Sequence, residues 1–449
     1  MDRTKRKLTF AELSAVKTKK LQSKLNDPDN LFQLIFALSQ LKSCRFTYFS
    51  ERDIALPIAT RKQHSTIETL ALYTVDTWNE ILTLTSYTSN LRRLITPCGM
   101  DRDIDIETLL PLRLSNLTYL RTCFNYLNFH EFEIFIKKIY SPLKILHVEF
   151  LVEDVNFRDS DCWENLILTS LSHLEELYLI YKERFPPSDD LIFSGKLNPF
   201  SSPFWIDRRW FFEVETDINF VNYIVRPYRK KWYEDVKNEV LHSSIEYSKF
   251  IQLTINDTDD DDDFYTTSFI LKHILTITNI HHLEIERSID IPLFIQLLNA
   301  LTDVETLKIY SIICDNRKVD YKKFSVASSI KKRSKIKNVY IKNVKNIDDI
   351  FLLMTLCPHI TYLKIDNINV INQNVNVESI VNDFINRSCN NSTNLVRLLC
   401  FRIPAADDGT IEKLKRTIIT NGITCDYTIK RIVDRIYIEW KLEPTIDSS

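Results

Sequence analysis

A short apolar pattern of the form L-x-x-L-x-L recurs along the 449-residue chain at nearly regular intervals. Its first positions fall into two runs: Leu41, Ile67, Leu91, Leu117, Leu143 and Leu174, then Phe250, Ile280, Val304, Ile336, Ile360 and Leu395. The spacings are 26, 24, 26, 26 and 31 residues in the first run and 30, 24, 32, 24 and 35 in the second, so they cluster near 24–26 although several units are longer. A chain that repeats at such a period is expected to stack similar units, because one unit alone cannot bury its apolar face.

Most of the gaps between these units contain a segment with helical spacing. We expect helices over 76–84, 130–139, 266–276, 292–301 and 348–356. In His130–Ile139, for example, the apolar residues recur at i, i+3, i+4 and i+7. A short strand followed by a helix, at a period inside the range of about 20–29 residues, is typical of leucine-rich repeats. The sequence therefore predicts an α/β leucine-rich-repeat-like solenoid, with a parallel sheet on its concave face and helices on its convex face.

Two other architectures are compatible with the same pattern. Strands that alternate with helices also occur in a doubly wound α/β sheet. An all-helical solenoid of the armadillo kind also stacks similar units along the chain. The repeat solenoid is preferred, because the units are short and nucleotide-binding loops are missing.

The repeats are interrupted once, and they end in a different kind of segment. The expected organisation is a polar N-terminal segment (1–28), N-terminal repeats (29–181), an aromatic-rich insertion or irregular repeats (182–246), C-terminal repeats (247–405), a cap (406–442) and a tail (443–449). The cap is expected to contain a helix over 408–420 and strands over 424–429 and 435–440, which would cover the apolar end of the last repeat.

Glycine is scarce, and the scarcity excludes whole classes of enzyme. The chain has only 4 glycines, at positions 99, 195, 409 and 422, so no G-x-G-x-x-G motif or P-loop is present. The nine histidines form no HExxH motif, and Cys357 and His359 are interpreted as part of a repeat turn rather than as a nucleophile and its base. The sequence predicts a protein that is not an enzyme and that holds no metal or cofactor.

The termini and the cysteines predict a location inside the cell, in the cytoplasm or the nucleus. The nine cysteines contain no C-x-x-C pair, which is typical of reduced thiols. The first ten residues are basic and lack an apolar signal region. No stretch approaches the roughly 18 apolar residues of a membrane span, so no membrane is expected as a partner.

The strand pattern also predicts a binding surface. In L-x-x-L-x-L the leucines point into the solenoid, so the residues between and beside them line the concave face. The candidate partner-binding residues on this face are Arg121, His147, Tyr178, Lys308, Tyr340, Lys364 and Arg397. Tyrosine and arginine are favoured at the centres of protein interfaces. We therefore expect a protein-protein interaction scaffold whose partner binds the concave face.

A nucleic-acid-binding protein is the alternative. The segment near 205–233 places Arg208, Arg209 and the basic run 226–231 among several aromatic residues. Such rings can stack on bases while the cations bind phosphate. The preferred interpretation of the same segment is a set of core aromatic residues flanked by solvated charge. The net charge of −2 also gives no bulk attraction for nucleic acid.

Two segments carry a resemblance to a known family. Residues 357–365, CPHITYLKI, resemble the C-P-x-L-x-x-L-x-L turn and strand of cysteine-containing leucine-rich repeats. Residues 394–401, followed by the expected cap, look like the C-terminal end of F-box/leucine-rich-repeat proteins. The resemblance covers the repeat region, about residues 30–440, and no F-box is found in residues 1–30. It implies a substrate-recognition subunit of a ubiquitin ligase, with a cullin-ligase adaptor as a partner.

Overall fold

The computed structural model describes residues 28–46, 59, 65–73, 78–96, 114–151, 154–184, 199–216, 220–229, 232, 251–256, 274–275, 279–313, 333–368, 398–402, 408–420 and 427–440. Three expected segments lie wholly or mostly outside these described residues: the polar segment 1–28, the helix over 266–276 and the tail 443–449. Arg397 of the candidate site also lies outside them.

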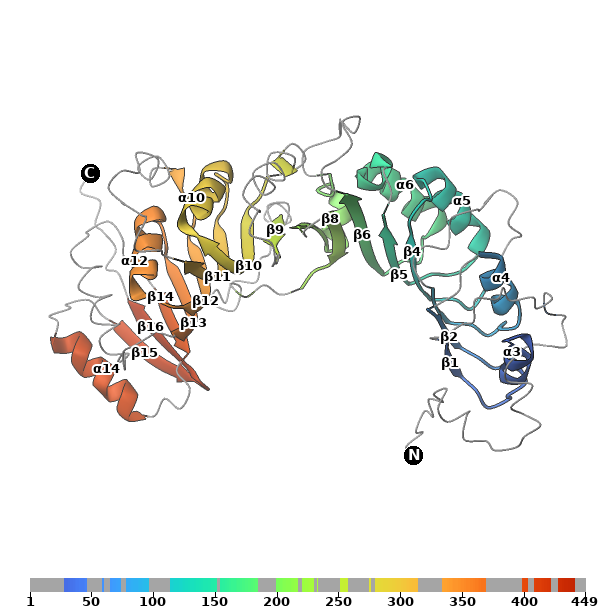
Figure 1. Cartoon of the computed structure of the whole chain (residues 1–449), viewed down its shortest axis with the longest axis horizontal. Coiled ribbons are helices and arrows are strands. Elements are labelled where there is room, and N and C mark those ends of the chain that lie inside the picture. The colour runs from blue at the N-terminus through green and yellow to red at the C-terminus, as the bar shows by residue number, and fades with distance from the viewer. Residues whose placement is uncertain are drawn as a thin grey trace. The chain divides into compact units, whose positions relative to one another are not determined.

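Sixteen strands in the described residues form one large, open sheet in which most neighbours are parallel (Figure 1). The strand order is β1-β2-β3-β4-β5-β6-β8-β7-β9-β10-β11-β12-β13-β14-β16-β15. This confirms the predicted α/β class and its mainly parallel sheet. The all-helical alternative is wrong.

The chain divides into two compact units. The first unit holds the described residues up to 184, together with 199–212 and 220–229. Its elements are α3 (Pro28–Phe36), β1 (Ser43–Phe46), β2 (Thr69–Leu72), α4 (Trp78–Ser86), β3 (Arg93–Ile95), β4 (Tyr119–Phe124), α5 (Phe129–Ile139), β5 (Ile145–Phe150), η1 (Val155–Arg158), α6 (Ser160–Ser170), β6 (Glu176–Arg184), α7 (Pro203–Asp207) and β8 (Phe220–Pro227).

The second unit holds residues 213–216, 232 and the described residues from 251 onward. Its elements are β9 (Gln252–Ile255), β10 (His282–Asp290), α10 (Ile291–Ala300), β11 (Thr306–Ile313), β12 (Asn338–Val344), α12 (Ile347–Leu356), β13 (Tyr362–Ile368), β14 (Leu398–Arg402), α14 (Asp408–Thr420), β15 (Tyr427–Ile432) and β16 (Arg435–Trp440). The strand β7 (Trp210–Thr216) contributes residues to both units.

The strand register follows the repeated pattern of the sequence. In the first unit each strand begins two residues after the first apolar position of its repeat, so the central leucines of the repeats form one row across the sheet. That row is Leu70, Leu94, Leu120, Leu146 and Leu177. The second unit has a matching row from Leu253 to Leu363. The strand starts expected near Leu117, Leu143, Leu174, Val304 and Ile360 are therefore confirmed.

The last repeat is shifted by one residue from its expected register. The structure pairs Leu363 with Leu399 and Lys364 with Cys400, whereas the sequence pattern had aligned Leu398 with Leu363. Adjacent leucines at 398 and 399 satisfy the pattern in either register, and the antiparallel strand β16 favours the observed one, because Ile438 lies opposite Leu399 and both are fully buried.

The same backbone hydrogen bonds recur from repeat to repeat. The carbonyl oxygen of Lys42 accepts from the amides of Glu68 and Thr69, at 2.9 and 3.0 Å. The corresponding carbonyls of the following repeats each accept from two consecutive amides in the same way; they are Glu68, Arg92, Thr118 and Lys144, then Ile251, His281, Glu305 and Lys337. A repeated apolar sequence is thus matched by a repeated turn.

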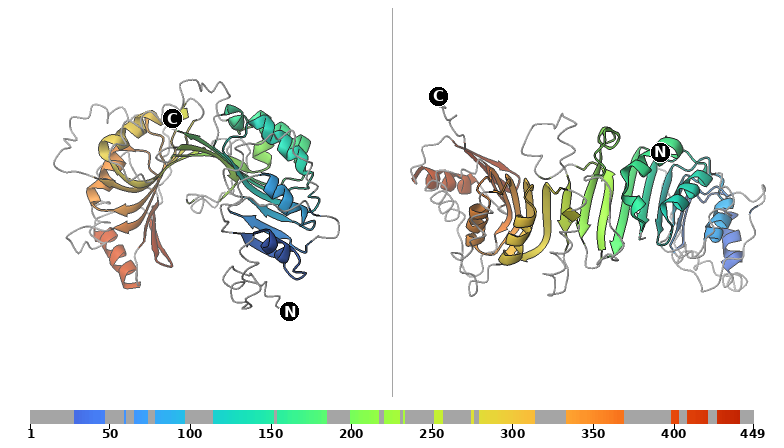
Figure 2. Two further views of the ribbon diagram at one scale, coloured as in Figure 1. Left: turned by 45° about the vertical axis from the view of Figure 1, so that its right-hand side comes forward. Right: turned by 90° about the horizontal axis from the view of Figure 1, so that it is seen from above.

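In each unit, the helices between parallel strands lie on one side of the sheet (Figures 1 and 2). On the helix side of β4 and β5, fully buried rings from both layers pack together: Phe124, Phe132, Phe150, Phe157 and Trp163. Phe132 of α5 lies 5.0 Å from Phe150, between ring centroids. A doubly wound sheet carries helices on both faces, so this one-sided arrangement differs from that alternative.

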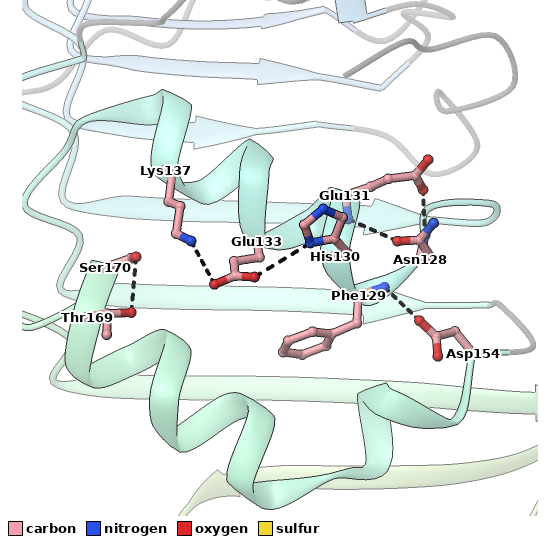
Figure 3. Close-up of polar contacts among 9 residues, drawn as sticks. All are labelled: Asn128, Phe129, His130, Glu131, Glu133, Lys137, Asp154, Thr169 and Ser170. Atoms are coloured by element: carbon pink, nitrogen blue, oxygen red, sulfur yellow. Dashed lines mark hydrogen bonds and ion pairs between the residues drawn. The ribbon is translucent and has the colours of Figure 1, made fainter. Parts of the chain in front are cut away.

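The start of α5 shows why these helices begin where they do (Figure 3). Asn128 accepts a hydrogen bond from the amide of Glu131, and the Glu131 carboxylate accepts one from the amide of Asn128, which together form a capping box. A third amide, that of Phe129, donates to Asp154 from the next repeat, at 2.7 Å. Neighbouring repeats are therefore joined by capping as well as by the sheet.

The irregular stretch expected over 182–246 adds antiparallel strands to the sheet. β8 pairs antiparallel with β6, whereas β7 pairs parallel with β9. Trp205 and Trp210 are buried and pack with Phe200 and Phe212. The expected aromatic cluster of this segment is thus a core.

The C-terminal elements are close to those expected. α14 and β16 have the predicted bounds, and β15 begins three residues later than predicted. β16 pairs antiparallel with β14 on one side and with β15 on the other. It therefore covers the edge of the last parallel strand, which would otherwise expose unpaired backbone groups.

Candidate functional site

Side chains alternate between the two faces of each strand, and the helices identify which face is which. Phe124 on β4 contacts Phe132 of α5, so Tyr119 and Arg121 on the same strand point away from the helices. We call this side of the strands the helix-free face. It corresponds to the face on which the sequence placed the candidate residues.

In the first unit, the structure brings the three predicted residues together on this face. Arg121, His147 and Tyr178 are direct neighbours in register on β4, β5 and β6. The rings of His147 and Tyr178 are nearly parallel, with centroids 3.9 Å apart. Tyr119 lies on the other side of His147, at 5.2 Å. Tyr119, His147 and Tyr178 form a continuous row of rings, which we call the aromatic ladder.

Two arginines lie beside the aromatic ladder, and a third lies further along the same face. The guanidinium of Arg93 on β3 lies 3.8 Å from the centroid of the Tyr119 ring, a close cation–π contact. Arg121 is exposed, and so is Arg45 on β1, which lies over Tyr73 at 5.5 Å. Arg93 was missed by the sequence analysis. It lies in the same row as Tyr119, so extending that row by one strand would have found it.

The electrostatics of the ladder keep His147 neutral. Burial lowers the pKa of His147 to about 4, and the charges of Arg121 and Arg93 act in the same direction. Glu176 opposes them weakly, and its carboxylate accepts a hydrogen bond from the hydroxyl of Tyr178 at 2.9 Å. At neutral pH the ladder is therefore an uncharged set of rings in a positive field.

We expect the imidazole of His147 to titrate with a midpoint near pH 4 in the folded protein. The unfolded chain takes up this proton near pH 6.5, so the contribution of His147 to stability is lost as the pH falls from about 6.5 through 4. An NMR titration of the histidine signals measures this, and His147→Gln identifies the signal by its loss. Arg121→Gln should raise the midpoint. A wild-type midpoint near 6.5 would contradict the described packing.

In the second unit, the predicted residues Lys308, Tyr340 and Lys364 are also neighbours in register. Lys308 forms an ion pair with Glu284 on the adjacent strand. The Lys364 ammonium lies 4.5 Å from the centroid of the Tyr340 ring.

The hydroxyl of Tyr340 donates to Asp366, whose carboxylate also pairs with Arg435 at 3.3 Å. Burial, followed by this hydrogen bond, raises the pKa of Tyr340. The polar groups of this face are therefore paired with one another.

A tryptophan of the chain itself packs on this face. The Trp232 ring lies 5.4 Å from that of Tyr340 and 6.1 Å from that of Tyr362. Tyr340 and Lys364 are each only 9% exposed. The sequence thus placed both residues on the correct face, but they are buried rather than open to a partner. The strand pattern could not reveal this, because the tryptophan comes from a distant part of the sequence.

We expect Trp232→Ala to expose the rings of Tyr340 and Tyr362, because Trp232 packs against both of them. Hydroxyl-radical footprinting read by mass spectrometry measures this as a rise in oxidation at the two tyrosines. Tyr119, in the first unit, serves as the internal control and should keep its oxidation rate. Unchanged rates at Tyr340 and Tyr362 would show that Trp232 does not cover them in solution.

The basic and aromatic segment near 205–233 offers few open rings in its described part. Trp205, Trp210, Phe211 and Phe212 are buried. Arg208 is exposed, but it lies 3.8 Å over the ring of Phe204 in the same segment. Base stacking needs accessible ring faces, and the four buried rings do not offer them, whereas Phe220, Tyr228 and Trp232 are half-exposed. The nucleic-acid alternative therefore stays a prediction.

The described residues contain no group of three or more His, Cys, Asp and Glu side chains placed to hold a metal ion. Cys357 ends α12, is buried, and has a pKa raised to about 12 by that burial, whereas His359 is exposed. Of the helices in this part of the chain, none is both long and apolar enough to span a membrane.

Comparison with protein-family models and with curated proteins found no match for this chain. The fold and the side chains of the helix-free face are therefore the features from which a function can be inferred.

Proposed function

We propose that this chain is a non-enzymatic protein-binding scaffold, built as a leucine-rich-repeat-like solenoid. We propose further that it recognises its partner through the helix-free face of the first unit. The observation that carries the proposal is the aromatic ladder flanked by Arg93 and Arg121. Partner-binding residues on this face are Tyr119, Arg121, His147 and Tyr178, with Arg93 added.

The solenoid is supported by the repetition of structure at the period of the sequence. Central leucines form a row across parallel strands, and one carbonyl in each turn accepts from two amides of the next repeat. Helices lie on one side of these strands in each unit (Figure 2). These are the features of stacked repeats that bury a shared core.

Protein binding is supported by the kind of side chains on the open face. Tyrosine and arginine are enriched among the residues that contribute most to binding energy at protein interfaces. The ladder rings are held by stacking on one another, so little rotational freedom is lost when a partner covers them. The row of stacked rings with cations beside it is therefore preorganised for binding a partner.

A non-enzymatic role is supported by the state of the thiols. Burial raises the pKa of Cys44 and of Cys357 to about 12, and that of Cys162 to about 11. The thiolate, which is the reactive form of cysteine, is disfavoured at these positions. These three thiols are therefore poor nucleophiles, which supports a role in binding rather than in bond making.

The resemblance to F-box/leucine-rich-repeat proteins suggests a more specific role. Under this proposal the bound partner is a substrate, a cullin-ligase adaptor is a second partner, and the protein acts in the cytoplasm or nucleus. Recovery of such an adaptor with the purified protein would support this role. Purification of a face-dependent partner without any ligase component would leave the scaffold function and remove the ligase role.

Affinity purification from cells followed by mass spectrometry tests the proposed function. The test variant is Arg121→Ala/Tyr178→Ala on the helix-free face. The matched control is His130→Ala/Lys137→Ala on the exposed side of α5 (Figure 3), which also removes one ring and one cation. We expect the control to keep the partner and the test variant to lose it. Equal recovery by both variants would overturn the proposal, and recovery of RNA alone would favour the nucleic-acid alternative.

A further inference from the structure

Positive charge on the helix-free face of the first unit is not balanced by its neighbours. Arg45, Arg93 and Arg121 are exposed and come from β1, β3 and β4. In the part of the chain that the structure describes, none of the three forms an ion pair. Arg229 adds a further positive charge, whose field reaches Tyr178.

The acidic side chains of the same face already have partners. Glu149 pairs with Lys182 at 2.6 Å, and Glu176 accepts the hydroxyl of Tyr178 at 2.9 Å. These two carboxylates therefore do not neutralise the arginines by forming ion pairs with them. The field of Arg93 and Arg121 is strong enough at His147 to oppose its protonation, which agrees with a surface that is positive at the ladder.

We infer that the partner of the proposed function presents a carboxylate-rich segment of polypeptide to Arg93 and Arg121. This inference rests on the proposed function and names the chemistry of the partner. One face of the Arg93 guanidinium is covered by Tyr119, and its N–H edges lie in the plane of the group. Those edges can donate two parallel hydrogen bonds to one carboxylate.

The spacing of the two arginines suits side chains on an extended segment. Arg93 and Arg121 lie on adjacent strands and differ by two positions in register, since Ile95 is the direct neighbour of Arg121. Parallel strands are about 4.8 Å apart and rise about 3.3 Å per residue, so the two Cα atoms are separated by about 8 Å. Alternate side chains of an extended peptide are about 7 Å apart, which brings two acidic residues within reach of the two arginines.

A protein segment fits this surface better than a nucleic acid does. Bases bind by stacking on open ring faces, but the imidazole of His147 is stacked on Tyr178 at 3.9 Å, and the tilted ring of Tyr119 lies 5.2 Å away on its other side. The central ring of the ladder therefore offers a base little open ring face. Glu149 and Glu176 would also repel a continuous phosphate backbone, whereas separate carboxylates can avoid them.

The test uses the full chain and a fluorescent peptide of alternating glutamate and serine, read by anisotropy at low and moderate salt. A peptide with glutamine in place of glutamate is the uncharged probe. The binding variant is Arg93→Gln/Arg121→Gln, and the charge-matched control is Lys137→Gln/Lys138→Gln on α5. All are exposed or half-exposed side chains, so both variants should fold, which circular dichroism verifies.

We expect the wild type to bind the glutamate peptide, more weakly as salt increases, and to leave the glutamine peptide unbound. The arginine variant should raise Kd by about tenfold, and the lysine variant should change it by less than about twofold. No binding of the glutamate peptide, or equal loss in both variants, would overturn the inference. So would tighter binding of a single-stranded oligonucleotide through the same arginines. If the cellular partner still depends on Arg121 and Tyr178 while the glutamate peptide fails to bind, the scaffold function stands and the acidic partner is refuted.

Discussion

Replacing Glu183 with glutamine should lower the free energy of unfolding by about 3–5 kcal/mol, because it leaves a buried guanidinium without its charged partner. Arg158 and Glu183 are 1% and 3% exposed, and their side chains are 3.1 Å apart. The Glu183 carboxylate also accepts the hydroxyl of Tyr223 at 2.8 Å. Arg158 itself lies within 6 Å of the ring centroids of Tyr181 and Tyr223, so aromatic rings rather than charged groups flank the ion pair there.

This ion pair lies where the regular repeats of the first unit end. Arg158 comes from η1, Glu183 from the far end of β6, and Tyr223 from β8, the antiparallel neighbour of β6. Three elements of different repeats are therefore fixed by one carboxylate. Its loss should weaken the docking of β8 on β6 in particular.

Lys182→Gln is the matched control for this prediction. Lys182 is the preceding residue on the same strand, and it pairs with Glu149 on the half-exposed helix-free face. Exposed pairs of this kind contribute about 0–1 kcal/mol. Urea unfolding followed by circular dichroism compares the two variants with the wild type. Equal midpoints for Glu183→Gln and Lys182→Gln would show that the pair is not buried in solution.

Phe150→Ala should be comparably destabilising, by about 3–5 kcal/mol, because it opens a cavity in the core between sheet and helices. Phe150 is fully buried on β5, and its ring lies 3.8 Å from that of Phe157 and 5.0 Å from that of Phe132, between centroids. It also stacks with Phe124 at 5.6 Å. It also lies 6.1 Å from the ring of Trp163 on α6, so the removed ring is shared by two strands, one 3₁₀ helix and two α-helices.

The same strand carries His147 on its other face, so this prediction links the core to the candidate site. We expect Phe150→Ala to shift the urea midpoint strongly and to broaden the NMR signal of His147 as β5 loosens. Phe150→Leu fills most of the cavity and should cost less than about 1.5 kcal/mol. If alanine and leucine give the same midpoint, the aromatic packing around β5 is not as described.

The repeated part of the fold could be predicted from the sequence, because each repeat carries apolar residues at the same few positions. A leucine that must reach the core in every strand fixes the face of its neighbours, so Arg121, His147 and Tyr178 were placed side by side before their contacts were known. The period of the pattern fixed the parallel order of the strands in the same way.

Other features depend on contacts that no local pattern contains. The predicted register of β14 was wrong by one residue, because Leu398 and Leu399 fit the sequence pattern equally well. Pairing with β16 decides between them. The antiparallel pairing of β6 with β8 could not be predicted, because no sequence repeat covers β8. Tyr340 also packs against Trp232, which is remote in sequence.

We propose that a protein partner binds the helix-free face of the first unit, and site-specific photo-cross-linking in cells detects such a contact. A photoreactive amino acid placed at position 121 lies beside the aromatic ladder, and one placed at position 137 lies on the exposed side of α5 (Figure 3). In cells, we predict that position 121 gives a discrete cross-linked protein and that position 137 does not. Cross-linking to the same protein from position 137 alone, with none from position 121, would contradict the account.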